Sequence, residues 1–122
     1  MKANELRIGN MINSYGKDRL MEHNDFSVFA LYESKKEEPP YNPIPLTEEW
    51  LLKFGFKRSP ANNSIYLPVP ELKAEIHYEM FRKQLVCVLY CSTGSFIPND
   101  IKYVHQLQNL YFALTGEELT IK

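Results

Sequence analysis

Glu75, His77 and Glu79 are the residues whose types and spacing best suit chemistry, because they recur at every second position of the segment LKAEIHYEM. Alternate residues of a β-strand share one face, so the three side chains would form a row with neighbours about 6 to 7 Å apart. Two carboxylates beside an imidazole can move a proton or bind a small ligand. The same alternation is typical of the solvent-exposed side of an antiparallel sheet, so both interpretations stay open.

His105 raises the question of a second site, in which it would act as a general base or a metal ligand, although the sequence favours a structural histidine. A pair of metal ligands on one helix needs a second histidine, cysteine or carboxylate three or four positions away. Those positions hold Ile101, Lys102, Gln108 and Asn109, so there is no helical metal pair. The motif STGS contains one glycine and no lysine, which excludes a phosphate-binding loop. The sequence therefore predicts no metal site, no cofactor and no catalytic residue, and it argues against an enzyme.

The elements that would position these residues are strands followed by a helix. The pattern predicts antiparallel strands at about 64–69, 72–81 and 84–91, of which the second alternates apolar and polar residues and the third is apolar throughout. A C-terminal helix is expected at about 100–115, with Asn99 as its cap and a glycine after its last residue. The row of acidic residues and histidine would thus lie on the middle strand.

A short helix at 47–54 has the clearest start and stop signals in the chain. Thr47 can cap the first free amide groups, and two glutamates follow it in the first turn. Gly55 supplies the left-handed residue that ends a helix, and Phe56 can fold back on Leu51 in a Schellman arrangement.

The N-terminal part has a different pattern. Short apolar pieces separated by turn residues predict a β-meander over residues 1–34, a spacing that also fits a small barrel-like sheet. Residues 35–45 are rich in charge and proline, which predicts an exposed, extended connector. Together these elements predict an α+β fold in a single domain, residues 1–122.

The C-terminal helix has too little charge for an ordinary surface helix. From Gln84 to Thr115 the chain carries two charged residues, Asp100 and Lys102, although 24% of all residues are charged. Such a face of amides and aromatic rings resembles the centre of a protein interface. It would be covered by the protein's own N-terminal part, by a second copy or another protein, or by a ligand in a pocket. The face comprises Tyr103, His105, Gln106, Gln108, Asn109, Tyr111 and Phe112.

The overall composition excludes several classes of protein. With 122 residues, of which 44% are hydrophobic, the chain can bury a core of its own. Its net charge of −1 argues against nucleic-acid binding. The N-terminus MKANELRIGN lacks the apolar stretch of a signal peptide, and the longest apolar run, LVCVLYC, is far shorter than a membrane span. We therefore expect a cytoplasmic protein that does not enter a membrane.

Three motifs resemble a known family. The segments IPLTEEWLLKFGF at 44–56 and IKYVHQLQNLYFALTGEEL at 101–119, together with ELRIGN at 5–10, are similar to those of small uncharacterised proteins from gut anaerobic bacteria, their bacteriophages and mobile elements. No activity or site residue is assigned to that family. The resemblance implies a cytoplasmic, phage-related accessory protein.

Three functions follow from the sequence, in order of preference. The first is a non-enzymatic module that binds an unidentified protein partner or forms a homo-oligomer through the charge-poor C-terminal helix. The second is a small-ligand binder or enzyme that uses the face of Glu75, His77 and Glu79. The third is an accessory protein that binds nucleic acid.

Overall fold

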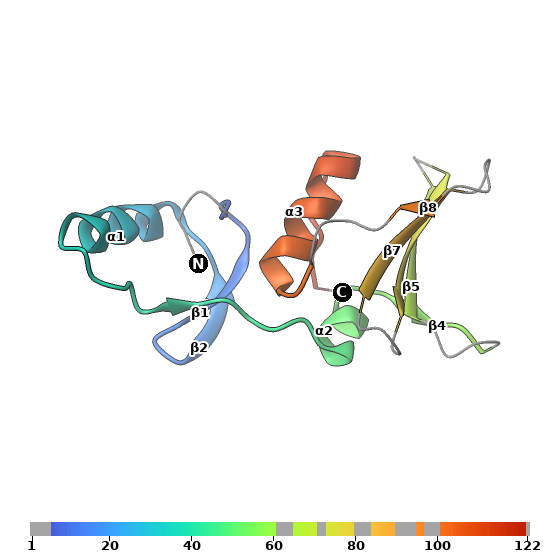
Figure 1. Cartoon of the computed structure of the whole chain (residues 1–122), viewed down its shortest axis with the longest axis horizontal. Coiled ribbons are helices and arrows are strands. Elements are labelled where there is room, and N and C mark those ends of the chain that lie inside the picture. Colours follow the sequence, from blue (N-terminus) through green and yellow to red (C-terminus); the bar gives the residue numbers. More distant parts are fainter. Residues whose placement is uncertain are drawn as a thin grey trace.

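The computed structural model describes residues 6–60, 65–70, 73–79, 84–89, 95–96 and 101–121. These residues form an α+β fold with an antiparallel sheet of three strands and a second antiparallel sheet of five strands. Figure 1 shows how the elements are arranged. The predicted fold class is confirmed.

The N-terminal unit, residues 6–42, contains the three-stranded sheet and one helix. Strands β1 (Met11–Ser14) and β2 (Lys17–Leu20) form a hairpin, and helix α1 (His23–Ser34) follows. Strand β3 (Tyr41–Asn42) then returns to pair with β1, so the sheet order is β2-β1-β3. In Figure 1 this unit lies at the opposite end of the molecule from the five-stranded sheet.

The meander expected for residues 1–34 is correct for the hairpin and wrong for the part that forms α1. Tyr15 and Gly16 turn the hairpin with φ angles of 53° and 84°, the two positive values of a type I′ turn. After the hairpin a helix begins because the Asp25 carboxylate accepts the Glu22 N–H at 2.7 Å, which satisfies a free amide at the helix start. The sheet is open within the described residues, so the barrel-like form is not found there.

The connector expected at 35–45 is exposed throughout residues 35–38 and only in part beyond them. Tyr41 and Ile44 are buried, because this segment pairs first with β1 and then with the chain before the last helix. The Val104 N–H donates to the Ile44 carbonyl at 2.8 Å. Proline removes a donor from its own position but leaves the neighbouring amides and carbonyls free to pair, which is why the segment is ordered against a sheet.

The C-terminal unit, residues 44–121, contains the remaining elements. The strands expected at about 64–69 and 84–91, on either side of the strand with Glu75, His77 and Glu79, are confirmed. Residues 64, 72, 80–81 and 90–91, at the ends of the three expected strands, lie outside the described part of the chain. The elements are α2 (Glu48–Lys53), β4 (Lys57–Arg58), β5 (Ile65–Val69), β6 (Ala74–Glu79), β7 (Gln84–Leu89), β8 (Ser95–Phe96) and α3 (Val104–Thr115). The order of the strands in the sheet is β4-β5-β6-β7-β8.

Helix α2 forms as predicted, with both of its ends satisfied by local hydrogen bonds. Thr47 Oγ1 accepts the Trp50 N–H at 3.4 Å. At the other end Gly55 has a φ of 94°, and the Phe56 N–H donates to the Leu51 carbonyl at 3.1 Å. This is the long bond of a Schellman motif.

Helix α3 starts later than expected. The predicted cap, Asn99, lies outside the described residues. The chain is still extended at Lys102 and Tyr103, where the Leu46 N–H donates to the Lys102 carbonyl at 2.9 Å. Gln106 then caps the helix, because its Oε1 accepts the N–H groups of Lys102 and Tyr103 at 2.8 and 3.1 Å. Pairing with a distant segment therefore delays the start of the helix.

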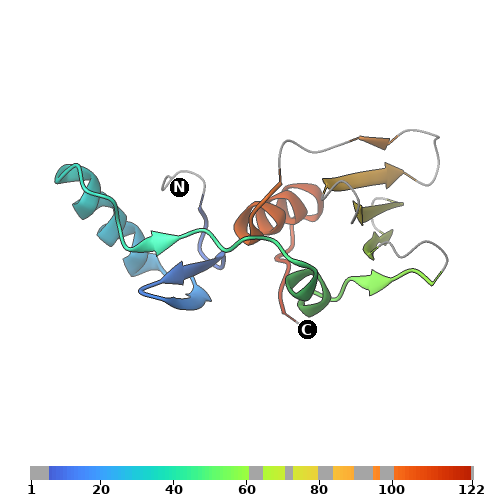
Figure 2. The same ribbon diagram turned by 60° about the horizontal axis from the view of Figure 1, so that its bottom comes forward.

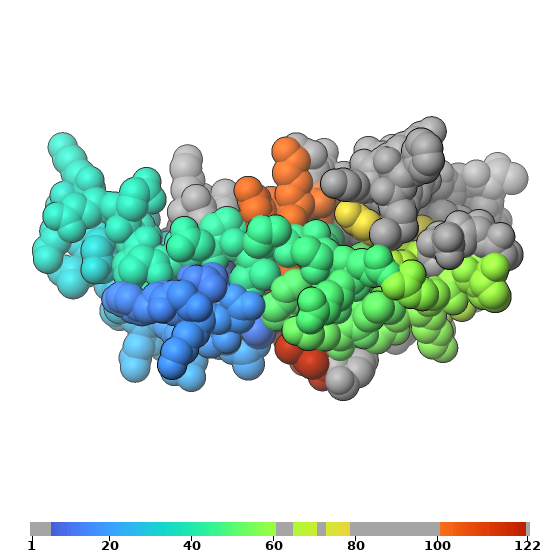
Figure 3. Space-filling view, turned by 90° about the horizontal axis from the view of Figure 1, so that it is seen from below, coloured from blue at the N-terminus to red at the C-terminus, as the bar shows by residue number. Residues whose placement is uncertain are grey.

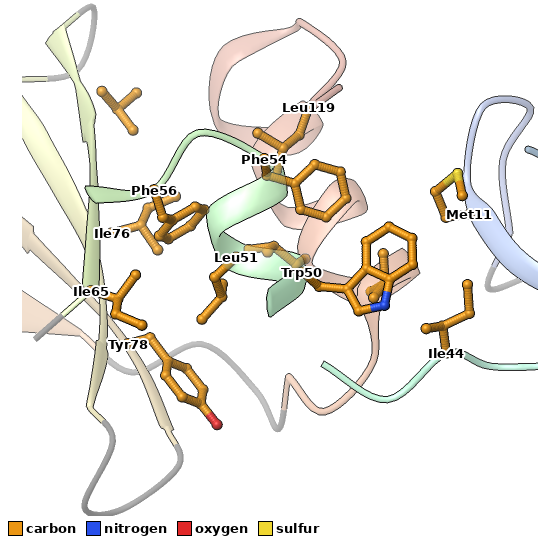
Figure 4. Packing of buried hydrophobic residues seen from close by; sticks show 13 residues of the cluster. Met11, Ile44, Trp50, Leu51, Phe54, Phe56, Ile65, Ile76, Tyr78 and Leu119 are labelled. Carbon is orange, nitrogen blue, oxygen red and sulfur yellow. The ribbon is translucent and has the colours of Figure 1, made fainter. Parts of the chain in front are cut away.

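Two separate clusters of buried apolar side chains lie on either side of α3, which stands between the N-terminal unit and the five-stranded sheet in Figures 1 and 2. The larger cluster joins α2, α3 and the inner face of the five-stranded sheet, and Figure 4 shows how its side chains meet. Met11 is the contribution of the N-terminal unit to the larger cluster. The smaller cluster contains Leu6, Ile12, Met21, Phe29 and Tyr41.

Candidate functional site

The two units are joined at a seam where a fully buried amide, Gln108 on α3, bonds to backbone atoms on both sides. Its Oε1 accepts the Met11 N–H at 2.7 Å. Its Nε2 lies 3.2 Å from the Gly9 carbonyl and 3.4 Å from the Leu119 carbonyl, and it can donate to both. Because β1 and α3 are otherwise distant in the chain, this side chain fixes where the N-terminal unit docks.

Charged and amide groups surround this contact. Arg7 donates from Nε to Asn109 Oδ1 at 2.8 Å, and its Nη1 lies 2.5 Å from Glu118 Oε1. Asn10 Nδ2 donates to the same Asn109 oxygen at 2.9 Å. We call these four residues together with Gln108 the polar clasp.

The polar clasp explains part of the charge-poor face predicted on the last helix. Gln108 and Asn109 are bonded to the protein's own N-terminal unit, and the Arg7 guanidinium lies 4.1 Å from the ring centroid of Phe112. At Gln108 and Asn109 the first of the three expected coverings, the protein's own N-terminal part, therefore applies. The helix needs little charge here because another part of the chain packs on it.

The other predicted members of this face have different neighbours. His105 is 1% exposed and its ring stacks on Tyr103, with centroids 6.0 Å apart. His105 was expected on the charge-poor face of the helix, and it is buried because α3 is packed on more than one side. Gln106 caps the helix, and Tyr111 packs against the larger cluster. The residues of the predicted face therefore have three different roles: some bond at the seam, one caps the helix and others pack in the interior.

A pocket of about 440 Å³ opens at the seam beside the polar clasp. It lies where the hairpin, α2 and the C-terminal segment meet, and these are the blue, green and red parts that adjoin in Figure 3. Its volume is within the ~300–1,000 Å³ range of small-molecule sites. We call it the seam pocket. Its described lining consists of Gly9, Met11, Arg19, Leu20, Phe54, Gln108, Leu119, Thr120 and Ile121.

Apolar side chains dominate the lining of the seam pocket. Met11, Phe54 and Leu119 are buried in the larger cluster, whereas Leu20 and Ile121 are 54% and 50% exposed. Exposed large apolar side chains beside a concavity are typical of a binding site. None of these five residues was predicted to belong to a site, because the pocket is formed by segments that are far apart in the chain.

The charged residue of this lining, Arg19, is paired with a buried carboxylate. Its Nη1 donates to Asp25 Oδ2 at 2.8 Å, and its Nη2 bonds to Asp25 Oδ1. Asp25 is 5% exposed and also accepts from the Tyr41 hydroxyl at 2.8 Å and from the Glu22 N–H. The hydrogen bond from Arg19 lowers the pKa of Asp25 from 3.8 to about 2, so the pair is ionised at neutral pH. Burial and the hydrogen bond to Asp25 raise the pKa of Tyr41 to about 12.

The structure describes two side chains of the predicted row on the middle strand, those of Glu75 and His77. His77 Nε2 lies 2.6 Å from Glu75 Oε2, and both side chains are about one-quarter exposed. Tyr66, which is opposite His77 in the β5–β6 register, stacks on the imidazole with centroids 5.9 Å apart. The side chain of Glu79 lies outside the described residues. Within the described residues no group of three histidine, cysteine, aspartate or glutamate side chains is placed to hold a metal ion.

Comparison with models of protein families, with curated proteins and with solved structures gives no match. The resemblance to proteins of gut anaerobic bacteria and bacteriophages therefore stays a prediction. Among the helices of the described residues, none has the length and apolar character needed to cross a membrane.

Proposed function

We propose that this protein is a non-enzymatic binding protein whose site is the seam pocket, and that it acts in the cytoplasm. The observation that carries the proposal is a pocket of about 440 Å³ lined mainly by apolar side chains from both units. Burial of an apolar ligand there would contribute about 25 cal/mol for each Å² removed from water. The class of function is the small-ligand binder considered second in the sequence analysis, at a different site.

The polar side chains of the seam pocket support binding rather than catalysis. Gln108 uses both ends of its amide to hold the backbone of the seam. Arg19 is paired with Asp25, whose lowered pKa makes it a poor general base. The close pair of Glu75 and His77 belongs to β6, in the five-stranded sheet, and neither residue is part of the described pocket lining. Gln108 and Arg19 therefore hold structure, and the apolar surface of the pocket remains for a ligand.

We expect Nile red, an uncharged apolar dye, to bind the wild-type protein with a rise in fluorescence, and Leu20→Glu to weaken this binding by at least about tenfold. The physical reason is that a carboxylate at the rim must lose water when the dye enters. The measurement is a fluorescence titration at pH 7.

Leu31→Glu on α1 is the matched control, because Leu31 is 52% exposed and Leu20 is 54% exposed. Leu31 is not part of the described pocket lining. Its variant should bind the dye as the wild type does. Equal loss in both variants, or no binding by the wild-type protein, would contradict the proposal.

Self-association is the second candidate, and the observation that favours it is the exposed ring of Phe112. Phe112 is 39% exposed on a helix whose twelve residues carry no charge. We expect light scattering coupled to size exclusion to show a dimer that Phe112→Glu dissociates. Leu52→Glu is the control, because Leu52 is also 39% exposed but lies on α2. A monomer at every concentration tested would rule this candidate out.

A further inference from the structure

We infer that the ligand of the seam pocket is an uncharged and mainly apolar molecule. This inference rests on the proposed function and adds the chemical class of the ligand. It follows from three properties of the lining, namely its apolar side chains, the balance of its charge and the use of its amide groups.

The first property is the origin of the apolar surface. Met11 and Leu20 come from the hairpin, Phe54 from the end of α2, and Leu119 and Ile121 from the segment after α3. Leu20 and Ile121 are 54% and 50% exposed and offer the surface that a ligand can contact directly, whereas Met11, Phe54 and Leu119 are buried beneath it. A ligand seated there therefore meets mainly apolar side chains. Each buried methylene would then contribute about 0.8 kcal/mol.

The second property is that the charge in the lining is already balanced. Both terminal nitrogens of Arg19 bond to the carboxylate of Asp25, which is buried and stays ionised at neutral pH. An anionic ligand would lose its water and would have to compete with this carboxylate for the guanidinium. A cationic ligand would meet the guanidinium itself. The ion pair therefore favours a ligand without charge.

The third property is that the amide in the lining is committed to the protein. Gln108 accepts from Met11 at 2.7 Å, and its nitrogen lies within hydrogen-bond distance of the carbonyls of Gly9 and Leu119. A strongly polar ligand would have to break these bonds, which hold the N-terminal unit in place. A ligand with few hydrogen-bonding groups leaves them intact.

Both units line the seam pocket, so occupancy is coupled to docking. Gly9 and Leu20 belong to the N-terminal unit, whereas Phe54 and Thr120 belong to the C-terminal unit. A ligand that contacts both binds the docked arrangement better than any open one, and it stabilises that arrangement by mass action.

Three probes with the same eight-carbon chain test the inference, namely 1-octanol, octanoate and octylammonium. The full chain is titrated with each probe at pH 7 while the backbone amide signals of Gly9, Leu20 and Thr120 are followed by two-dimensional NMR. We expect 1-octanol to shift these signals to saturation and both charged probes to bind at least about tenfold more weakly. Leu20→Glu should remove the response to 1-octanol, and Leu31→Glu should keep it.

The possible failures are distinguishable. If octanoate or octylammonium binds as tightly as 1-octanol at these amides, the inference about ligand class is overturned while the proposed binding function stands. If none of the three probes shifts these signals, both the inference and the proposed function are overturned.

Discussion

Asp25→Asn is expected to lower the free energy of unfolding by about 3 kcal/mol, near the lower end of the range for breaking a buried ion pair. The substitution removes the charge that balances Arg19 and weakens the acceptor of the Tyr41 hydroxyl and the Glu22 N–H. The loss is not larger because the Arg19 side chain is 38% exposed and can regain water. Urea-induced unfolding followed by circular dichroism measures the change.

Asp18→Asn is the matched control, because Asp18 is an exposed carboxylate on the same hairpin. Its loss should stay below about 1 kcal/mol, as is usual for surface substitutions. A similar effect of both substitutions would show that the buried pair has no special role in stability.

The same carboxylate makes stability depend on acid. Folding lowers the pKa of Asp25 from 3.8 to about 2, so the folded state binds its proton less readily than the unfolded chain does. The contribution of ionised Asp25 to the free energy of unfolding is complete above about pH 4. It is lost as the pH falls through 4 toward 2, to a total of roughly 2 kcal/mol. In Asp25→Asn the unfolding free energy should fall less steeply over this pH window. An unchanged slope would contradict the assignment.

Gln108→Leu is expected to cost about 2 to 3 kcal/mol, because it leaves the Met11 N–H and the Gly9 carbonyl without their partner in a buried seam. The loss of stability should be largest at the seam between the two units. Hydrogen exchange measures it directly, since the Met11 amide should exchange faster than in the wild type. Dye binding in the seam pocket should weaken in parallel, because Gln108 holds together the two units that line the pocket.

Gln106→Leu provides the comparison, because it makes the same substitution two residues away on the same helix. Gln106 caps α3 through the N–H groups of Lys102 and Tyr103, and among the described residues its side chain makes no hydrogen bond with the N-terminal unit. This variant should lose about 1 kcal/mol of cap stabilisation and keep the protection of the Met11 amide. Equal exchange at Met11 in the two variants would contradict the role of Gln108.

Local signals predicted the elements that depend on neighbours in the chain. Thr47 and Gly55 mark the two ends of α2 as expected. The alternation of apolar and polar residues around His77 correctly predicted strand β6. The same kind of signal failed at α1, where short apolar pieces separated by turn residues suggested strands. There the buried carboxylate of Asp25, which caps the helix and pairs with Arg19, decided the outcome. No pattern of residue spacing in the sequence predicts such an ion pair.

The candidate site was not predictable for a related reason. Sequence analysis selected the face containing Gln108 and Asn109 and left open whether the protein's own chain, a partner or a ligand covered it. It did not indicate that Leu20 and Ile121 border a pocket beside that face.

The amino-acid sequence by itself determined the α+β class, the capped short helix, the strands on either side of the acidic row and the low charge of the last helix. Each of these depends on residues a few positions apart, whose spacing is visible in the chain. Tertiary structure alone decided that Arg7 meets Asn109, that Met11 meets Gln108 and that the seam pocket lies beside these contacts. Those partners are separated by 102 and 97 residues, and docking of the two units is what brings them together.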